Sequence, residues 1–218
     1  MSINNGSKTF DHIAAGWYNF RHHTIFKTEL GSLARRWRSG KLLNVGCGHG
    51  ADFLPFKNSL ALVGIDISSG MLKYAERYMG KYGFTAELKQ GDMRSLPFPD
   101  ASFDFAMAVA SIHHIDSKLG RIEAIQELYR ILKPGGEAFV TVWNASQPRF
   151  IFKQRDILVP WRSKEEVIDR FYHLFSYGEL EKLVKSVGFK IISSRPESSY
   201  RLPIKYYSRN ICVLIKKP

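Results

Sequence analysis

Short apolar runs alternate with amphipathic segments along most of this chain. The apolar runs predict strands at 41–45, 61–66, 85–90, 104–109, 137–143, 189–195 and 209–216. The segments between them predict helices near 68–80, 118–132 and 176–187. In the middle helix, apolar residues recur at helical spacing at Leu119, Ile122, Ile125, Leu128 and Leu132. This alternation favours an α/β fold with a doubly wound sheet.

The first apolar run leads into three closely spaced glycines, Gly46, Gly48 and Gly50. Glycine permits the positive φ of a tight strand-to-helix turn and lets backbone N–H groups contact a ligand. The spacing fits both the dinucleotide fingerprint and the form typical of S-adenosylmethionine (SAM) enzymes. Cys47 lies between the glycines, where a small residue is needed, so we expect it to pack and not to act as a nucleophile.

An acid follows the turn at a characteristic distance. Asp66 ends the second apolar run, twenty residues beyond Gly46, so a parallel second strand brings it beside the first turn. Its carboxylate can then bind a ribose diol. Both candidate cofactors contain that ribose, so Asp66 does not distinguish them.

Three later segments carry a family resemblance: Gln90-Gly91-Asp92-Met93, the strand within 102–109, and Leu132-Lys133-Pro134-Gly135-Gly136. Together with the glycine turn, they resemble the class I SAM-dependent methyltransferases over nearly the whole chain. The resemblance implies a seven-stranded Rossmann-like sheet of order 3-2-1-4-5-7-6 with the last strand antiparallel. It implies SAM as cofactor and S-adenosyl-L-homocysteine as product, with Asp92 and Met93 beside the adenine. The implied cofactor-binding residues in these core segments are Gly46, Cys47, Gly48, Gly50, Asp66, Ile67, Asp92, Met93 and Ala110.

Size and composition indicate one domain over residues 1–218. The chain has 218 residues, of which 44% are hydrophobic, enough for one well-filled α/β core. Neither a signal peptide nor an apolar run of membrane-spanning length is visible, so we expect a cytoplasmic protein without a membrane association. The two cysteines and the histidines lack zinc-site spacing, so no metal site is expected.

Positive charge is concentrated outside the cofactor half. Residues 41–143 carry 11 Lys and Arg against 11 Asp and Glu, whereas residues 1–40 carry 6 against 2 and residues 144–218 carry 15 against 7. The two flanking parts therefore account for the whole net charge of +12. In methyltransferases of this kind they cover the substrate, so a polyanion such as tRNA is the expected partner.

The segment from Phe10 to Arg21 resembles the N-terminal lid of many small class I methyltransferases. We therefore interpret about 8–40 as a lid and about 144–188 as substrate-side elements. The resemblance places Tyr18 and Arg21 over SAM, where they can approach its methionyl carboxylate. The alternative for Tyr18 is packing within an amphipathic helix.

The adjacent His113 and His114 follow the predicted fourth strand. In the superfamily this stretch lies beside the transferred methyl group. Adjacent side chains diverge at the end of a strand, so we expect both to face substrate, or one to pack while the other does.

The C-terminal third resembles a narrower family, the tRNA wobble-uridine carboxymethyl methyltransferases. The residues that carry this resemblance are Val159-Pro160-Trp161, Arg170 to Phe175, Gly178-Glu179-Leu180 and Arg209-Asn210. The family esterifies the carboxylate of 5-carboxymethyluridine at the anticodon wobble position. The chain departs from the family pattern at its late arginine, where Ser208 and Arg209 stand beside Asn210 without the acidic residue.

This reaction needs side chains that hold and aim a carboxylate. A carboxylate with a pKa near ~4 is ionised at neutral pH, so it needs no general base to attack the methyl group. The predicted catalytic residues are His113, His114, Arg170, Tyr172, His173 and Arg209. The alternative for Tyr172 and His173 is a buried turn before the helix at 176. Trp143 and Trp161 could stack on a splayed base or simply pack.

The resemblance also implies a partner. Members of the family pair with a small zinc-binding activator that adds a strand beside strand three, here Thr85-Ala86-Glu87-Leu88-Lys89. Two other functions remain open at this point. A small-molecule methyltransferase of the quinone-biosynthesis type would share the lid and the Leu-Lys-Pro-Gly-Gly turn. A degenerate scaffold conflicts with the intact glycines and Asp66.

Overall fold

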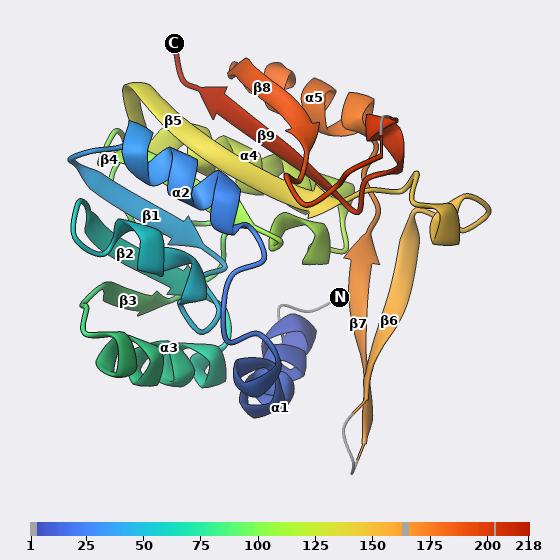
Figure 1. The fold of residues 1–218 in the computed structure, drawn as a ribbon, viewed down its shortest axis with the longest axis horizontal. Helices are drawn as coiled ribbons and strands as arrows, with labels where there is room; N and C mark the ends of the chain where they lie inside the picture. The colour runs from blue at the N-terminus through green and yellow to red at the C-terminus, as the bar shows by residue number, and fades with distance from the viewer. Residues whose placement is uncertain (1–3, 163–165, 203) are drawn as a thin grey trace.

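A seven-stranded sheet forms the centre of the computed structural model, which describes residues 4–162, 166–202 and 204–218 (Figure 1). Its strands are β1 (Lys41–Val45), β2 (Ala61–Asp66), β3 (Glu87–Gln90), β4 (Phe103–Val109), β5 (Leu132–Trp143), β8 (Lys190–Pro196) and β9 (Asn210–Lys216). Their order is β3-β2-β1-β4-β5-β9-β8, and β9 is antiparallel to both neighbours. The predicted order and the antiparallel last strand are confirmed.

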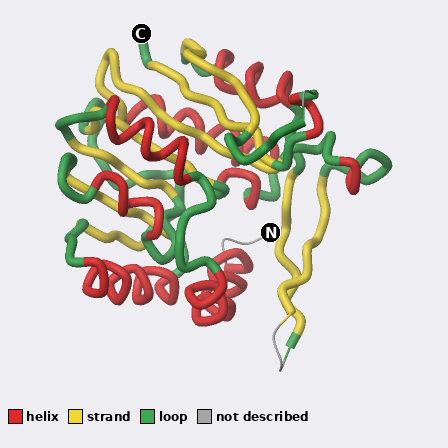
Figure 2. The backbone as a smooth tube through the Cα atoms, in the orientation of Figure 1, coloured by secondary structure: helices red, strands yellow, loops and turns green. Residues whose placement is uncertain are grey.

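Helices cover both faces of this sheet (Figure 2). They are α1 (Asn4–Phe20), α2 (Lys27–Arg36), α3 (Ser69–Tyr82), α4 (Lys118–Ile131) and α5 (Tyr177–Ser186), with 3-10 turns at Ala51–Phe56, Ile112–His114, Pro148–Phe150 and Lys205–Tyr207. The three helices that follow strands of the sheet or the hairpin begin at serine caps: the hydroxyls of Ser68, Ser117 and Ser176 accept backbone N–H groups of the first turn. Such caps satisfy N–H groups that have no partner inside the helix.

The five inner strands are largely apolar because both of their faces are buried, whereas the edge strands β3 and β8 carry charged residues. Within β1, Leu43 and Val45 join the core that includes residues of α4 and α5, whereas Leu42 joins the core under α2. Side chains alternate across a strand, so a continuous apolar run supplies both layers. This explains why the strands were predictable.

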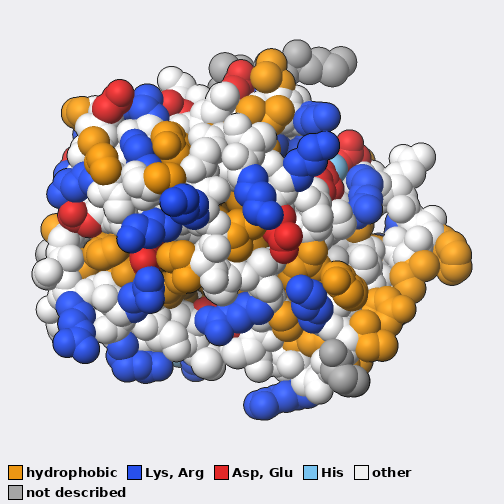
Figure 3. All heavy atoms as spheres, turned by 90° about the horizontal axis from the view of Figure 1, so that it is seen from above, with side chains coloured by type: hydrophobic (Ala, Val, Ile, Leu, Met, Phe, Trp, Pro, Cys, Tyr) orange, Lys and Arg blue, Asp and Glu red, His pale blue; other side chains and the backbone are white. Residues whose placement is uncertain are grey.

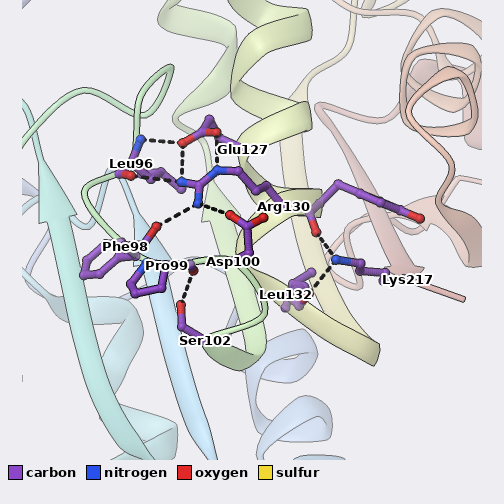
Figure 4. A network of polar contacts seen from close by, with 10 residues as sticks. Leu96, Phe98, Pro99, Asp100, Ser102, Glu127, Arg130, Leu132 and Lys217 are labelled. Atoms are coloured by element: carbon purple, nitrogen blue, oxygen red, sulfur yellow. Dashed lines mark hydrogen bonds and ion pairs between the residues drawn. The ribbon is translucent and has the colours of Figure 1, made fainter.

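The loop after β3 is fixed to α4 by one arginine (Figure 4). Arg130 binds the Glu127 carboxylate through Nε at 2.6 Å and the Asp100 carboxylate through Nη1 at 2.7 Å. It also donates to the carbonyls of Leu96 and Phe98. The loop that carries the predicted adenine contacts is therefore held on a rigid helix.

A two-stranded hairpin stands apart from the sheet. It consists of β6 (Asp156–Arg162) and β7 (Val167–His173), and Figure 1 shows it beyond the end of β5, with α1 lying between it and α3. The sequence did not predict this hairpin. The alternative that Tyr172 and His173 form a turn before the helix is wrong, because both lie on β7, paired with β6.

The predicted lid is also structured. Helix α1 packs against α3 and β7. Asp11 on α1 accepts hydrogen bonds from the Ser68 hydroxyl at 2.6 Å and from the backbone N–H of Gly70 at 2.8 Å. Burial would raise the pKa of Asp11, but these hydrogen bonds lower it overall. The carboxylate therefore fastens α1 to the amino end of α3, where negative charge is favourable.

Candidate active site

A cavity of about 500 Å³ opens at the carboxyl ends of β1, β2 and β4, beneath α1 and beside the hairpin. This is the position at which open parallel sheets bind ligands. The predicted residues that line it are Arg21, Gly46, Cys47, Gly48, Asp66, Ile67, Asp92, Met93, Ala110, His113, His114, Arg170 and Tyr172. The cavity also includes Trp143. The predicted residues Tyr18, Gly50, His173 and Arg209 are outside this lining.

The glycine turn forms the floor of the cavity. Gly46 has φ +69°, and a Cβ there would come within 2.5 Å of the Ser111 Cβ atom. Gly48 has φ +52°, and a Cβ there would meet no other atom within 4 Å. Gly50, with φ +83°, bends the chain toward α3 and does not line the cavity. Burial holds the pKa of the Cys47 thiol well above its ordinary value, which fits the expected packing role.

Asp66 is buried beside this turn. One carboxylate oxygen accepts the N–H of Gly48 at 2.7 Å, and the other accepts the N–H of Ser68 at 3.0 Å. Burial raises the pKa of Asp66 to about 6, although these hydrogen bonds lower it. Each oxygen has a second lone pair. The carboxylate can therefore still accept a pair of ligand hydroxyls.

Asp92 and Ala110 line neighbouring parts of the wall. Asp92 is already paired with Arg94, whose Nη2 lies 2.6 Å from Oδ2, so its carboxylate orients the loop as well as facing the cavity. Ala110 adopts φ +53°, and its N–H bonds Thr141 on β5. A positive φ at a non-glycine residue is strained and is often found at functional sites.

Two further polar residues of the cavity lining, Asp52 and His49, were not among the predicted site residues. Asp52 lies just beyond the glycine turn, and burial raises its pKa to about 6, against a hydrogen bond from Thr24 and the charge of Arg21, which lower it. Arg21 is half-buried there, and its Nε has no hydrogen-bond partner among the described residues. His49 Nε2 likewise has none, and burial lowers the pKa of His49 to about 4. The signal in the sequence was only that Asp52 follows Gly50 closely.

Tyr18 does not approach the cavity. It is buried among aromatic rings, 5.1 Å from Tyr74 and 5.7 Å from His49 between ring centroids. Tyr18 thus lies in the packing between α1 and α3, whereas Arg21 lines the cavity together with Phe10 and Trp17.

The paired histidines line the end of the cavity between α1 and the hairpin, where the His114 ring lies 4.9 Å from the Phe10 ring of α1. The His113 ring stacks on Tyr172 at 5.0 Å, and Tyr172 stacks in turn on Trp143 at 4.2 Å. The backbone N–H of Trp143 donates to His113 Nδ1 at 3.2 Å, and His114 Nδ1 lies 2.9 Å from the backbone carbonyl of Phe171. Burial lowers the pKa of both histidines, that of His114 to about 4. Both rings are therefore neutral at pH 7.

Arg170 extends from β7 into this end of the cavity. Only 7% of it is exposed, and its guanidinium lies over three rings, those of Trp17, Trp161 and Tyr172, at 5.6, 5.4 and 5.3 Å. Among the described residues no carboxylate forms an ion pair with it, and its Nε has no hydrogen-bond partner. A buried cation without an anion is costly. The arrangement can therefore bind an anionic ligand.

Two predicted catalytic residues do not fit that role. His173 is buried between two carboxylates, with Nδ1 2.5 Å from Asp156 and Nε2 2.7 Å from Glu179, so neither ring nitrogen is free for a substrate. The Arg209 side chain is 68% exposed outside the cavity, and its Nε lies 3.6 Å from Glu197. His173 instead ties the hairpin to α5. The next residue after Arg209, Asn210, reaches the cavity lining.

Comparison with known proteins agrees with this geometry. Residues 42–136 match the family model described as a methyltransferase domain. A protein of Encephalitozoon cuniculi assigned as a methyltransferase is 34% identical over 73% of this chain and 75% of its own length. The chain belongs to the class I SAM-dependent methyltransferases. This methyltransferase resembles the tRNA (carboxymethyluridine(34)-5-O)-methyltransferase of Schizosaccharomyces pombe, at 29% identity over 69% of this chain and 73% of that protein.

This chain covers a smaller part of some longer relatives and nearly all of several solved structures. It matches the tRNA (carboxymethyluridine(34)-5-O)-methyltransferase alkbh8 of Xenopus tropicalis at 26% identity over 96% of this chain but only 40% of that protein. Solved structures with the same fold include a SAM-dependent methyltransferase from Clostridium acetobutylicum, with a TM-score of 0.74 at 15% identity over 95% of this chain and 98% of that one. Another is a chain from a complex of the Haloferax volcanii Trm112 methyltransferase activator with a methyltransferase, with a TM-score of 0.67 at 18% identity over 96% and 97%. In the part of the chain that the structure describes, no helix is long and apolar enough to cross a membrane.

Proposed function

We propose that this methyltransferase esterifies the carboxylate of 5-carboxymethyluridine at the tRNA wobble position. The observation that carries the proposal is Arg170, a buried cation on the cavity wall with no carboxylate partner among the described residues. Its aromatic surroundings keep it in place, because three rings pack around the guanidinium. A substrate carboxylate would supply the missing anion.

The part of the cavity beside the glycine turn suits SAM. Arg21 lines this part, so its guanidinium can donate to the methionyl carboxylate. Asp66 can accept the ribose hydroxyls on its remaining lone pairs, while Ile67 and Met93 provide apolar surface for the adenine. Bound SAM supplies a reactive methyl group on a positively charged sulfur.

The chain's own residues have to aim the acceptor. A carboxylate is ionised at neutral pH, so no side chain has to remove a proton. Arg170 and the Nε2–H of His113 can hold one carboxylate oxygen while leaving the other toward the cofactor side. Stacking of Tyr172 on Trp143 and on His113 limits the motion of these donors. Positioning of this kind is a large part of methyl-transfer catalysis.

We further propose that residues 1–218 act as one methyltransferase unit. The lid at about 8–40 covers SAM, the elements at about 144–188 face the substrate, and an RNA partner explains the net charge of +12. Strand β3 is the edge of the sheet, so Thr85-Ala86-Glu87-Leu88-Lys89 is open to a strand from an activator subunit with a zinc site. The activator complex of the Haloferax volcanii neighbour supports this assignment.

The names of the relatives favour RNA over a small quinone-like substrate, since those from Schizosaccharomyces pombe and Xenopus tropicalis are tRNA carboxymethyluridine methyltransferases. Mass spectrometry of tRNA nucleosides from cells that lack the gene tests the proposal. We expect the methyl ester of carboxymethyluridine to disappear and its free acid to accumulate. An unchanged ester pool would refute the function.

A further inference from the structure

Two exposed turns leave the rim of the cavity side by side. The β5–β9 ladder ends at the pair Trp143 and Asn210, which both line the cavity. One turn, residues 147–155, follows β5 shortly after Trp143, and the other, described at residues 198–202 and 204–209, precedes Asn210 on β9. Anything bound at this rim next to the cavity would meet both turns.

Two buried amides join the turns. Asn144 donates through Nδ2 to the carbonyls of Tyr206 at 2.6 Å and Ser208 at 2.9 Å. Gln147 donates through Nε2 to the carbonyl of Arg209 at 3.1 Å. Asn144 and Gln147 are almost fully buried, so these bonds are protected from water. These bonds join the bases of the two turns, and we name the surface made by their described residues the rim platform.

The rim platform combines exposed aromatic rings with positive charge. Phe152 is fully exposed at the tip of the first turn, and 55% of Tyr206 and 41% of Tyr207 are exposed in the second. The two segments contain six cations and no Asp or Glu, and all six are exposed: Arg149, Lys153, Arg155, Arg201, Lys205 and Arg209. In the view from above (Figure 3), Lys and Arg side chains lie among hydrophobic ones, with an apolar rim on the right, the side from which the first turn projects in Figure 1.

The nearest acids neutralise little of this charge. Glu197, just before the second turn, is buried and accepts the N–H of Asn210 at 2.7 Å, and it forms a long ion pair with Arg209, whose Nε lies 3.6 Å away. Asp156, just after the first, is paired with His173. The pKa of Arg149 is lowered by burial and, to a smaller extent, by the positive charge of Arg209. The Arg149 guanidinium lies over the rings of Trp143 and Phe150. The platform therefore favours a ligand with negative charges and exposed rings.

We propose that the rim platform binds the unpaired nucleotides that flank the wobble uridine. Their bases stack on Phe152 and Tyr206, and their phosphates contact the cations of both turns. This inference rests on the proposed function, because it takes the RNA to be an anticodon loop. Base stacking on an exposed aromatic ring tolerates any sequence, so the platform would serve several tRNAs. Five of the six cations, all but Arg209, form no ion pair among the described residues, and an uncharged protein surface docked on these rings would leave them without a partner.

The test measures binding of an unmodified anticodon stem-loop by fluorescence anisotropy over a series of salt concentrations. We expect Phe152→Ala and Tyr206→Ala each to raise the dissociation constant about 5- to 150-fold, without changing the salt slope. Lys153→Gln should instead flatten the salt slope. Ile192→Ala removes an exposed apolar side chain from β8, outside the rim platform, and should leave binding unchanged.

A second measurement reports stacking itself. A stem-loop with 2-aminopurine beside the wobble position should lose fluorescence on binding the wild-type chain and should keep it on binding the Phe152→Ala variant. Unchanged affinity and unchanged quenching in both aromatic variants would overturn the platform, as would binding of a protein in place of RNA at these rings. Because this RNA carries no carboxymethyl group, the result does not depend on methyl transfer. A failed methylation assay with Phe152-dependent binding would refute only the proposed reaction.

Discussion

His113 and His114 are adjacent in the chain but carry their protons on different nitrogens. The backbone N–H of Trp143 can only donate, so His113 Nδ1 must accept, and the proton of the neutral His113 ring is on Nε2. The Phe171 carbonyl can only accept, so His114 Nδ1 carries the proton and its Nε2 has the free lone pair. The pair therefore offers the cavity one donor, suited to a carboxylate, and one acceptor, suited to an N–H or hydroxyl of the substrate.

The first prediction concerns the pH dependence of turnover. Burial lowers the pKa of His114 to about 4 and that of His113 well below its ordinary value, so both rings stay neutral near pH 7. We expect kcat at saturating substrates to be flat between pH 6.5 and 8.5. A pH profile of wild type and of His114→Gln checks this. A step near pH 6.5 that vanishes in His114→Gln would show that a protonated histidine is required.

The second prediction separates the charge of Arg170 from its packing. Arg170→Met keeps much of the apolar stem between Trp17 and Trp161 but removes the guanidinium. Loss of a charge-assisted hydrogen bond costs about 1.5–3 kcal/mol, so kcat/KM for the carboxymethyl substrate should fall about 10- to 150-fold. The dissociation constant of SAM should not change. Arg195→Met, on the exposed outer strand β8, is the matched control; an equal loss there, or none in Arg170→Met, would contradict the role.

The third prediction links SAM affinity to Asp66. Burial raises the pKa of Asp66 in the free protein to about 6, and ribose hydroxyls bind its ionised form. SAM affinity should therefore be full above pH 7 and fall as pH decreases through 6, by at most about tenfold per unit. Calorimetry of Asp66→Asn should show weaker binding without that part of the slope. Asp52 is the control, because its pKa is also raised to about 6. The Asp52→Asn variant should therefore keep the pH dependence of SAM binding. If that pH dependence disappeared in Asp52→Asn but not in Asp66→Asn, the assignment of the ribose contact to Asp66 would be wrong.

The fourth prediction gives His173 a structural role. His173→Phe preserves the ring that packs on Phe175 but leaves the carboxylates of Asp156 and Glu179 without their partner. We expect the free energy of unfolding to fall by about 1–3 kcal/mol in urea titrations, with unchanged SAM affinity. His12→Phe, at an exposed site on α1, should change it by less than about 0.5 kcal/mol. Lost turnover with wild-type stability would instead indicate that His173 contacts the substrate.

The sequence predicted the sheet well but missed the hairpin. Leu42 and Leu43 are both buried, so a strand covered on both faces stands out as an apolar run. In β6, half-buried Ile157, Val159 and Trp161 alternate with exposed neighbours. That pattern is weaker, and Pro160 obscures it, because proline is tolerated only where a strand has an unpaired edge. A two-stranded hairpin offers such an edge.

The site was predictable where one local motif determines it. The glycine turn and Asp66 meet because two adjacent parallel strands end there. The proximity of Arg21 to Asp52 depends instead on how α1 docks, through contacts such as Asp11 with Ser68, which no local pattern contains. His173 was predicted to hold the substrate carboxylate because a histidine side chain can donate a hydrogen bond to a carboxylate. Its actual partners, Asp156 and Glu179, could be identified only from the fold.

The most direct test of the account is methyl transfer to two matched anticodon stem-loops, one with 5-carboxymethyluridine at the wobble position and one with uridine. The assay uses SAM labelled in its methyl group, with and without an activator subunit. We predict that label enters only the carboxymethyl RNA, as an ester that mild alkali releases as methanol, because the bond formed joins the methyl carbon to a carboxylate oxygen. Label in the uridine RNA, or label that resists alkali, would contradict a site in which Arg170 aims a carboxylate.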